Sequence, residues 1–205
     1  ARAELIAYDK QGKELINTNE ELPGKTGTIE INFDPLKSDT VRRIEIKVFD
    51  PVGRWVAFRL VAWYVEIPHD DVEFETGQAS IRPDEASKLD AVVGMIEKEI
   101  KAFRKALGRS DVGFNLKLYV AGCTDTVGSN KDNLALSRRR AKSIGQYFRG
   151  KAIKAPIFYE GFGEQLLAVP TADNVPEAKN RRAIYILTNT RPSGFERPNA
   201  RWHKL

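Results

Sequence analysis

The sequence has few of the residues that form covalent links or metal sites. Cys123 is the only cysteine among 205 residues, and the chain has two histidines. A single cysteine excludes a disulfide within the chain. So few sulfur and imidazole groups also argue against a zinc site. We therefore expect neither a bound metal nor a cofactor.

The chain also lacks a long hydrophobic run. It contains no stretch of about 18 apolar residues, which is the length that a membrane-spanning helix requires. The first residues, Ala1–Glu4, lack the apolar core of a signal peptide. If the protein is exported, we expect its signal or membrane anchor to lie outside this sequence.

What the chain does contain is typical of a globular protein. Hydrophobic residues make up 41% and charged residues 30%, so a packed core is expected and disorder is not. The net charge is +5 and the sequence pI is about 9.3. This mild basic bias suits an anionic polymer, a membrane surface or a nucleic acid, but it does not select among them.

Residues 1–68 are expected to form a small antiparallel β-domain of unknown role, with a sandwich as one arrangement. Stretches rich in β-branched and aromatic residues predict strands over Glu4–Asp9, Gly27–Phe33, Arg42–Asp50 and Arg54–Ile67. The sequence Asp50-Pro51-Val52-Gly53 predicts a turn that joins the last two strands. This domain is a candidate surface for a homodimer or for a partner protein.

Residues 69–190 alternate between strand and helix patterns. A short strand is expected at Val72–Phe74, and Pro83 opens a helix whose apolar residues keep helical spacing to Leu107. A second helix is expected over 131–148, and further strands over 116–122, 157–163 and 183–187. The fold class is therefore α+β, with the order β-α-β-α-β, and residues 191–205 are expected to form a polar tail on the surface.

The candidate site begins where the strand expected at 116–122 ends. Asp125 lies in the following loop, a position that ligands favour in α/β folds because the loop rests on a rigid base. On the next helix, Asn133, Ser137 and Arg140 are spaced i, i+4 and i+7 and share one stripe. An aspartate and an arginine at one cleft suit a zwitterion, because the carboxylate binds an ammonium and the guanidinium binds a carboxylate.

These residues also form a pattern that resembles the OmpA C-terminal family, which includes the peptidoglycan-associated lipoprotein and the flagellar stator protein MotB. The matching positions are Gly122, Thr124, Asp125, Gly128, Asn133, Leu136, Ser137, Arg140 and Ala141. The resemblance extends to Phe74-Glu75-Thr76-Gly77, Gly161-Phe162-Gly163-Glu164 and Asn180-Arg181-Arg182, and so covers about residues 72–188. It implies a mixed sheet with two main helices on one face.

The resemblance implies a function as well as a fold. Family members bind the peptide stem of peptidoglycan through meso-diaminopimelate, with the motif aspartate on its amine and the motif arginine on its carboxylate. Carried over by position, these roles fall to Asp125 and Arg140. Further ligand contacts are implied for Asn133, Thr124, Leu136 and Glu75, and supporting roles for Gly128, Asn180 and Arg182. The expected protein is a non-catalytic tether in the periplasm, associated with the outer membrane or cell wall of a Gram-negative bacterium. The partner expected at residues 1–68, if not a second copy of the chain, is then an envelope protein.

This sequence departs from the family pattern at two positions. Cys123 stands where the family usually has histidine or an aromatic residue, and Glu75 is longer than the usual aspartate. Cys123 has a simpler interpretation as a small buried hydrophobic residue.

The motif residues also have other interpretations. Without the other motif residues, Asp125 is as consistent with a turn or helix-capping aspartate as with a ligand contact. The run Arg138–Arg140 cannot form one basic face, because successive helix residues point about 100° apart. A nucleic-acid binder is therefore not expected. The alternative function is a wall-acting hydrolase or an accessory domain of one, although residues 69–190 show no paired-carboxylate, Ser/His/Asp or metal-ligand pattern.

Overall fold

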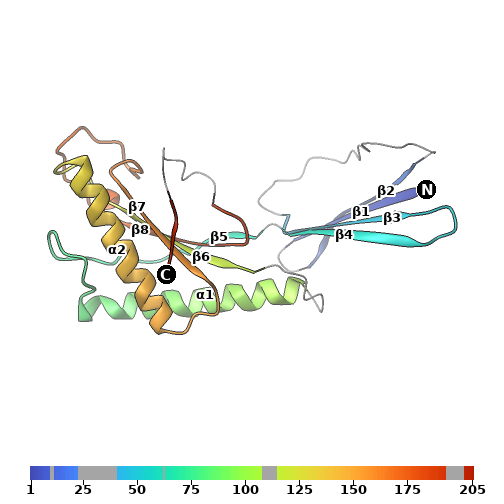
Figure 1. Cartoon of the computed structure of the whole chain (residues 1–205), viewed down its shortest axis with the longest axis horizontal. Coiled ribbons are helices and arrows are strands. Elements are labelled where there is room, and N and C mark those ends of the chain that lie inside the picture. The colour runs from blue at the N-terminus through green and yellow to red at the C-terminus, as the bar shows by residue number, and fades with distance from the viewer. Residues whose placement is uncertain (10–11, 23–40, 62, 108–114, 193–200) are drawn as a thin grey trace. The chain divides into compact units, whose positions relative to one another are not determined.

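The computed structural model describes residues 1–9, 12–22, 41–61, 63–107, 115–192 and 201–205 (Figure 1). The chain divides into two compact units. The first comprises residues 1–63 and 101–114, and the second comprises residues 64–100 and 115–205. No helix in the described ranges is both long and apolar enough to cross a membrane.

The first unit contains a four-stranded antiparallel sheet in the order β2-β1-β3-β4. Its strands are β1 (Arg2–Tyr8), β2 (Glu14–Glu21), β3 (Arg43–Phe49) and β4 (Trp55–Val61). Strand β2 was not predicted, because its sequence ELINTNEE is mostly polar. The strand expected at Gly27–Phe33 lies outside the described residues.

The predicted turn between β3 and β4 is confirmed. The Asp50 carboxylate accepts hydrogen bonds from the backbone N–H groups of Val52 and Arg54, at 3.0 and 2.9 Å. Gly53 has a φ of 87°, a left-handed conformation that favours glycine. The hairpin is therefore specified by local chemistry in the sequence.

The second unit has the expected α+β class, with two helices and a mixed sheet. The five strands lie in the order β5-β8-β6-β7-β9. They are β5 (Tyr64–Glu66), β6 (Lys117–Cys123), β7 (Ile157–Gly163), β8 (Ala183–Thr188) and β9 (His203–Lys204). Strands β6 and β7 are parallel, and the other pairs are antiparallel. The helices are α1 (Ala86–Leu107) and α2 (Asn130–Gly150).

Two predicted strands were wrong. The run Arg54–Ile67 forms two strands, since β4 pairs with β3 whereas β5 pairs with β8 of the other sheet. Its apolar residues belong to two cores, and composition alone does not mark that change. The segment Val72–Phe74 is not a strand, because the Glu73 N–H donates to the Glu85 carboxylate at 2.8 Å rather than to a neighbouring strand. The strand that precedes α1 is β5.

The described end of the tail expected over residues 191–205 lies largely at the surface, but it also forms an edge strand that the sequence did not predict. Strand β9 pairs with β7, and the Trp202 ring lies 4.9 Å from the Tyr119 ring in an edge contact. The Arg201 N–H donates at 3.1 Å to Glu160, whose side chain is fully buried. Trp202 and Leu166 cover a hydrophobic cluster on the sheet, which consists of Tyr119, Ala121, Cys123, Phe162, Ile184 and Ile186.

Helix α2 packs closely on β6 and β7, and two glycines allow this. A Cβ atom on Gly122 would overlap the Ser137 carbonyl oxygen, and one on Gly161 would overlap the backbone nitrogen of Arg138. The Ser137 hydroxyl also accepts a hydrogen bond from the Gly163 N–H at 2.9 Å. The position of α2 over the sheet is therefore fixed by backbone contact, and so is the position of any side chain that α2 carries toward the site.

Candidate functional site

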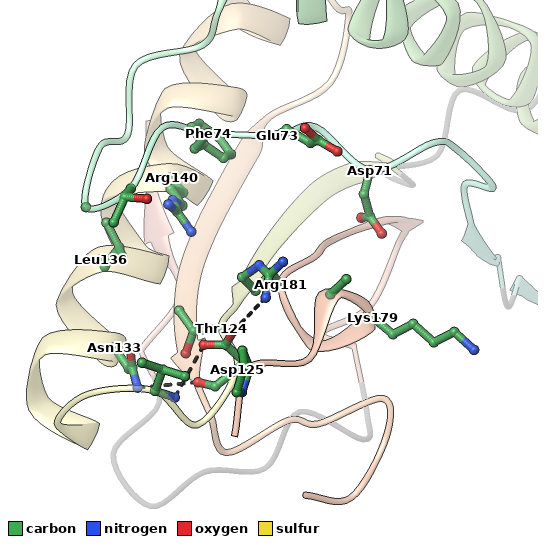
Figure 2. A pocket seen from close by; sticks show the side chains of 15 residues that line it. Asp71, Glu73, Phe74, Thr124, Asp125, Asn133, Leu136, Arg140, Lys179 and Arg181 are labelled. Atoms are coloured by element: carbon green, nitrogen blue, oxygen red, sulfur yellow. Dashed lines mark hydrogen bonds and ion pairs between the residues drawn. The ribbon is translucent and has the colours of Figure 1, made fainter. Parts of the chain in front are cut away.

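A cavity of about 660 Å³ lies in the second unit, at the end of β6 and beside α2 (Figure 2). The loop after β6, helix α2, residues 71–77 and residues 176–181 contribute to its lining. The lining includes three acidic and three basic side chains, namely Asp71, Glu73, Asp125, Arg140, Lys179 and Arg181. A cavity with both charges suits a ligand that also carries both.

Asp125 is held at the cavity by the loop that follows β6. The adjacent residue Thr126 fixes this loop, because its hydroxyl donates to the Ala172 carbonyl at 2.7 Å and accepts from the Val175 N–H at 3.1 Å. Asp125 does not cap α2, because Ser129 is the N-cap residue and its side chain accepts from the Asp132 N–H. The Asp125 carboxylate instead forms an ion pair with the Arg181 guanidinium, with 2.8 Å between Oδ2 and Nη1.

Thr124 and Asn133 line the cavity next to Asp125. The Asn133 side chain donates to the Glu164 carboxylate at 2.7 Å and to the Asp125 carbonyl at 3.4 Å, so it joins α2 to two loops. Thr124 is 3% exposed, and its hydroxyl has no hydrogen-bond partner within the described ranges. A buried hydroxyl without a partner is costly, so a ligand that bonded to it would gain affinity.

Arg140 reaches the cavity from α2, two turns after Asn133. Its guanidinium donates to the backbone carbonyls of Gln78 and Glu75, at 2.9 and 3.3 Å. It also lies over the Phe74 ring, 4.9 Å from the centroid. Burial and the nearby Arg181 guanidinium lower the pKa of Arg140, whereas Asp125 raises it. Arginine remains charged under such shifts, so the cavity keeps a fixed cation at this position.

Among the other predicted contacts, Leu136 lines the cavity and Glu75 does not. The Glu75 carboxylate is 69% exposed and lies 3.5 Å from the Arg82 guanidinium. Residues 73 and 74 line the cavity in its place, so the segment presents Glu73 to it. What Glu75 provides to the site is its backbone carbonyl, which holds Arg140.

Sequence reasoning missed Arg181, Lys179 and Asp71 as lining residues. Arg181 belongs to the Asn-Arg-Arg motif, in which Asn180 and Arg182 were chosen as supports. The nearest signal in the sequence is the pair of adjacent arginines, Arg181 and Arg182, for one of which a structural salt bridge and a ligand contact are equally consistent interpretations. Burial raises the pKa of Asp71, while His69, the Ala183 N–H and Arg182 lower it.

The three predicted supporting residues lie around this cavity in different ways. Asn180 is fully buried, and its side-chain oxygen accepts from the N–H groups of Ala168 and Val169 at 2.8 and 2.9 Å. Gly128 has a φ of 94°, and its N–H donates to the Asn174 side chain at 3.2 Å. The Arg182 carbonyl accepts from the Cys123 N–H at 2.9 Å. These contacts support the loops that carry the lining residues.

Cys123 is a buried hydrophobic residue, as its simpler interpretation predicted. It is 3% exposed and belongs to the cluster under Trp202. Burial raises the pKa of the Cys123 thiol to about 12, so the thiol stays protonated and unreactive near neutral pH. No group of His, Cys, Asp and Glu side chains in the described ranges is arranged to hold a metal ion.

Known proteins are similar in sequence to the part of the chain that forms this cavity. The sequence model of the OmpA family matches residues 73–181. Outer membrane protein P5 of Haemophilus influenzae is 33% identical over 118 residues, which are 57% of this chain and 28% of that protein. The peptidoglycan-associated lipoprotein of Pasteurella multocida strain Pm70 is 36% identical over 69 residues, which are 33% of this chain and 46% of that protein. The chain therefore spans less than half the length of either relative.

A solved structure shows a weaker likeness. The crystal structure of the peptidoglycan-associated lipoprotein from Burkholderia pseudomallei is 19% identical in sequence and superposes with a TM-score of 0.43. The superposition covers 57% of this chain and 88% of that one.

Proposed function

The chain belongs to the OmpA family, and on that premise we propose that its second unit binds bacterial cell-wall peptidoglycan and tethers an envelope protein to it. The relatives named above are an outer membrane protein and a peptidoglycan-associated lipoprotein. We place the protein in the periplasm on the same grounds. Its role is binding and not catalysis.

The ligand in this proposal is the free end of meso-diaminopimelate in the stem peptide. That end carries an ammonium and a carboxylate on one carbon atom. Asp125 binds the ammonium and Arg140 binds the carboxylate, while Thr124, Asn133 and Leu136 line the space between them. The observation that carries the proposal is the presence of both charges on one cavity of about 660 Å³.

The geometry suits recognition because the two charged groups are held by rigid elements. Arg140 stands on a helix that is seated on β6 and β7 through glycines, and two carbonyls orient its guanidinium. Asp125 stands in a loop that Thr126 ties to residues 172–175. Side chains held in this way lose little conformational freedom when a ligand binds, which favours affinity.

Co-sedimentation of the full chain with purified peptidoglycan sacculi tests the proposal. The wild-type protein is expected to pellet with sacculi, whereas Asp125→Asn and Arg140→Ala each reduce the bound fraction at least about tenfold, as expected when one partner of a charge pair is removed. Arg139→Ala is the matched control, because Arg139 is the adjacent arginine on α2 and is exposed. Its binding should equal that of the wild type.

Two outcomes would contradict the proposal. Equal sedimentation of the wild type and both site variants would show that the cavity does not bind the wall. Release of soluble muropeptides from sacculi by the pure protein would show that it is an enzyme. Circular dichroism of each variant establishes that the fold is retained.

A further inference from the structure

The aspartate assigned to the ligand's ammonium already has a cationic partner within the cavity. Arg181 Nη1 lies 2.8 Å from Asp125 Oδ2, and a dashed line marks this ion pair in Figure 2. The Asp125 side chain is 10% exposed, whereas the Arg181 side chain is 47% exposed. The carboxylate is therefore fixed and largely shielded, and the guanidinium is the member of the pair that has room to move.

The two arginines of the cavity differ in how they are held. Arg140 is fastened by two backbone carbonyls and the Phe74 ring. Within the described part of the chain, Asp125 is the side-chain partner of Arg181. The backbone next to Arg181 is fixed, because Asn180 is fully buried and bonded to residues 168 and 169. An exchange of partners at Arg181 therefore requires movement of its side chain alone.

This arrangement has a consequence for the choice of ligand. An ammonium that binds Asp125 competes with Arg181 for the same carboxylate. A simple amine replaces one cation by another and leaves the guanidinium without its anion. A zwitterion also brings a carboxylate, which gives Arg181 a new partner beside Arg140. Specificity then comes from an unpaired charge that only the wrong ligand creates.

We propose that Arg181 is a specificity-determining residue, which makes the cavity reject amines that lack an adjacent carboxylate. The proposal rests on the function proposed above and adds a residue that sets the ligand class. In the free protein, Arg181 pairs with Asp125, so the ligand's ammonium must displace it. In the complex, Arg181 pairs with the ligand's carboxylate beside Arg140. The ligand class is an α-amino acid terminus, and amines alone are excluded.

The test compares two small ligands by NMR titration of the full chain. The probes are meso-diaminopimelate and 1,5-diaminopentane, which is the same molecule without its two carboxylates. Wild-type protein is expected to prefer meso-diaminopimelate by at least about tenfold, a ratio typical of one unmatched charge. In Arg181→Ala, 1,5-diaminopentane binds more tightly and meso-diaminopimelate more weakly. The preference is expected to fall by at least about threefold.

Matched variants separate this role from a general effect of positive charge. Arg139 is an exposed arginine on α2 that does not line the cavity, so Arg139→Ala should keep the wild-type preference. Arg181→Lys should retain most of the preference, because it keeps the competing cation. Arg181→Gln repeats the loss with a longer polar side chain in case the alanine variant does not fold.

The possible results distinguish this inference from the proposed function. A wild-type protein that binds the two probes equally, or an Arg181→Ala preference within about threefold of wild type, would overturn the inference. An equal loss in Arg139→Ala would also overturn it. The proposed function survives those results if meso-diaminopimelate binds and Asp125→Asn abolishes binding. If wild-type protein binds neither meso-diaminopimelate nor sacculi, both proposals fail.

Discussion

Strands β4 and β8 have similar apolar sequences but opposite environments. Strand β4 reads WVAFRLV and β8 reads AIYILT. Every residue of β8 is buried, because Ile184 and Ile186 pack in the cluster under Trp202 and the Tyr185 ring lies 5.2 Å from the Phe148 ring of α2. In β4, by contrast, four large apolar side chains are more than half exposed, namely Trp55, Val56, Phe58 and Leu60. Strand β4 is the last strand in the order of its sheet.

The difference shows what holds the site of the second unit in place. In the second unit, a helix seated on the sheet fixes polar residues at the end of a buried strand. In the first unit, the described sheet carries its apolar surface outward at β4. Apolar composition predicts a strand in both cases. What packs against the faces of the strand decides whether its apolar side chains form part of a core.

Truncation of one phenylalanine in each unit should give the largest difference in the free energy of unfolding. Phe162 is 2% exposed and Phe58 is 57% exposed. We expect Phe162→Ala to lower the free energy of unfolding by about 4 kcal/mol, because it leaves a cavity in a packed cluster. Phe58→Ala should lower it by less than about 1 kcal/mol. Urea denaturation monitored by circular dichroism measures both values.

Similar losses in the two phenylalanine variants would remove the contrast between the units. A large loss in Phe58→Ala alone would show that β4 is covered in solution. The variant Phe58→Leu, which keeps an apolar side chain without the ring, would then help to distinguish lost apolar contact from lost aromatic contact.

A pair of glycines should give the next largest effect, for different physical reasons in the two units. A Cβ on Gly161 would overlap the backbone of α2, whereas a Cβ on Gly53 would meet open space but require a φ near 87°. Gly161→Ala should cost about 3 kcal/mol, since a helix must shift. Gly53→Ala should cost about 1 kcal/mol, the strain of a left-handed residue. Thermal unfolding distinguishes them.

The glycine pair also reports on the site. Since Arg140 and Asn133 stand on α2, Gly161→Ala should weaken sedimentation with sacculi, and Gly53→Ala should not. A Gly161→Ala protein with wild-type stability and binding would contradict the close packing of α2 on β7.

Much of the second unit was predictable from local patterns. The apolar spacing from Leu89 to Leu107 predicted α1, and the strand over 157–163 was predicted at the bounds of β7. The resemblance to the OmpA family implied ligand contacts for Thr124, Asp125, Asn133, Leu136 and Arg140, and all five line one cavity. These elements depend on periodicity and on residues close in sequence, which a single chain displays directly.

The parts that were missed depend on distant partners. The polar strand β2 forms because β1 supplies its hydrogen bonds, and its own sequence gives little sign of a strand. The end of the chain pairs with β7 across more than 40 residues, and Glu160 receives the Arg201 N–H. The role of Glu73 in place of Glu75 depends on how an irregular segment crosses the cavity. Such contacts depend on the tertiary fold and produce no periodic pattern of residues in the sequence.

Replacement of one carboxylate in each sheet should give the smallest difference in the free energy of unfolding. Glu160 is fully buried and accepts from the Arg138 guanidinium and the Gly161 N–H, each at 2.7 Å. Glu45 is 15% exposed and lies 2.8 Å from Arg59, whose side chain is 34% exposed. Replacement of Glu160 by glutamine should cost about 2 kcal/mol, because charged hydrogen bonds are lost out of contact with water. Glu45→Gln should cost at most about 1 kcal/mol, since solvent screens a pair that remains partly exposed.

The ionic strength dependence sharpens this last comparison. Added salt should reduce the cost of Glu45→Gln, because screening weakens exposed pairs in the wild type. The cost of Glu160→Gln should change little with salt, since no solvent reaches its carboxylate. Urea denaturation at low and high salt measures both costs. If the two variants lose equal stability at both salt concentrations, the sheets do not differ in how they bury charge, and the contrast between the units is confined to their apolar surfaces.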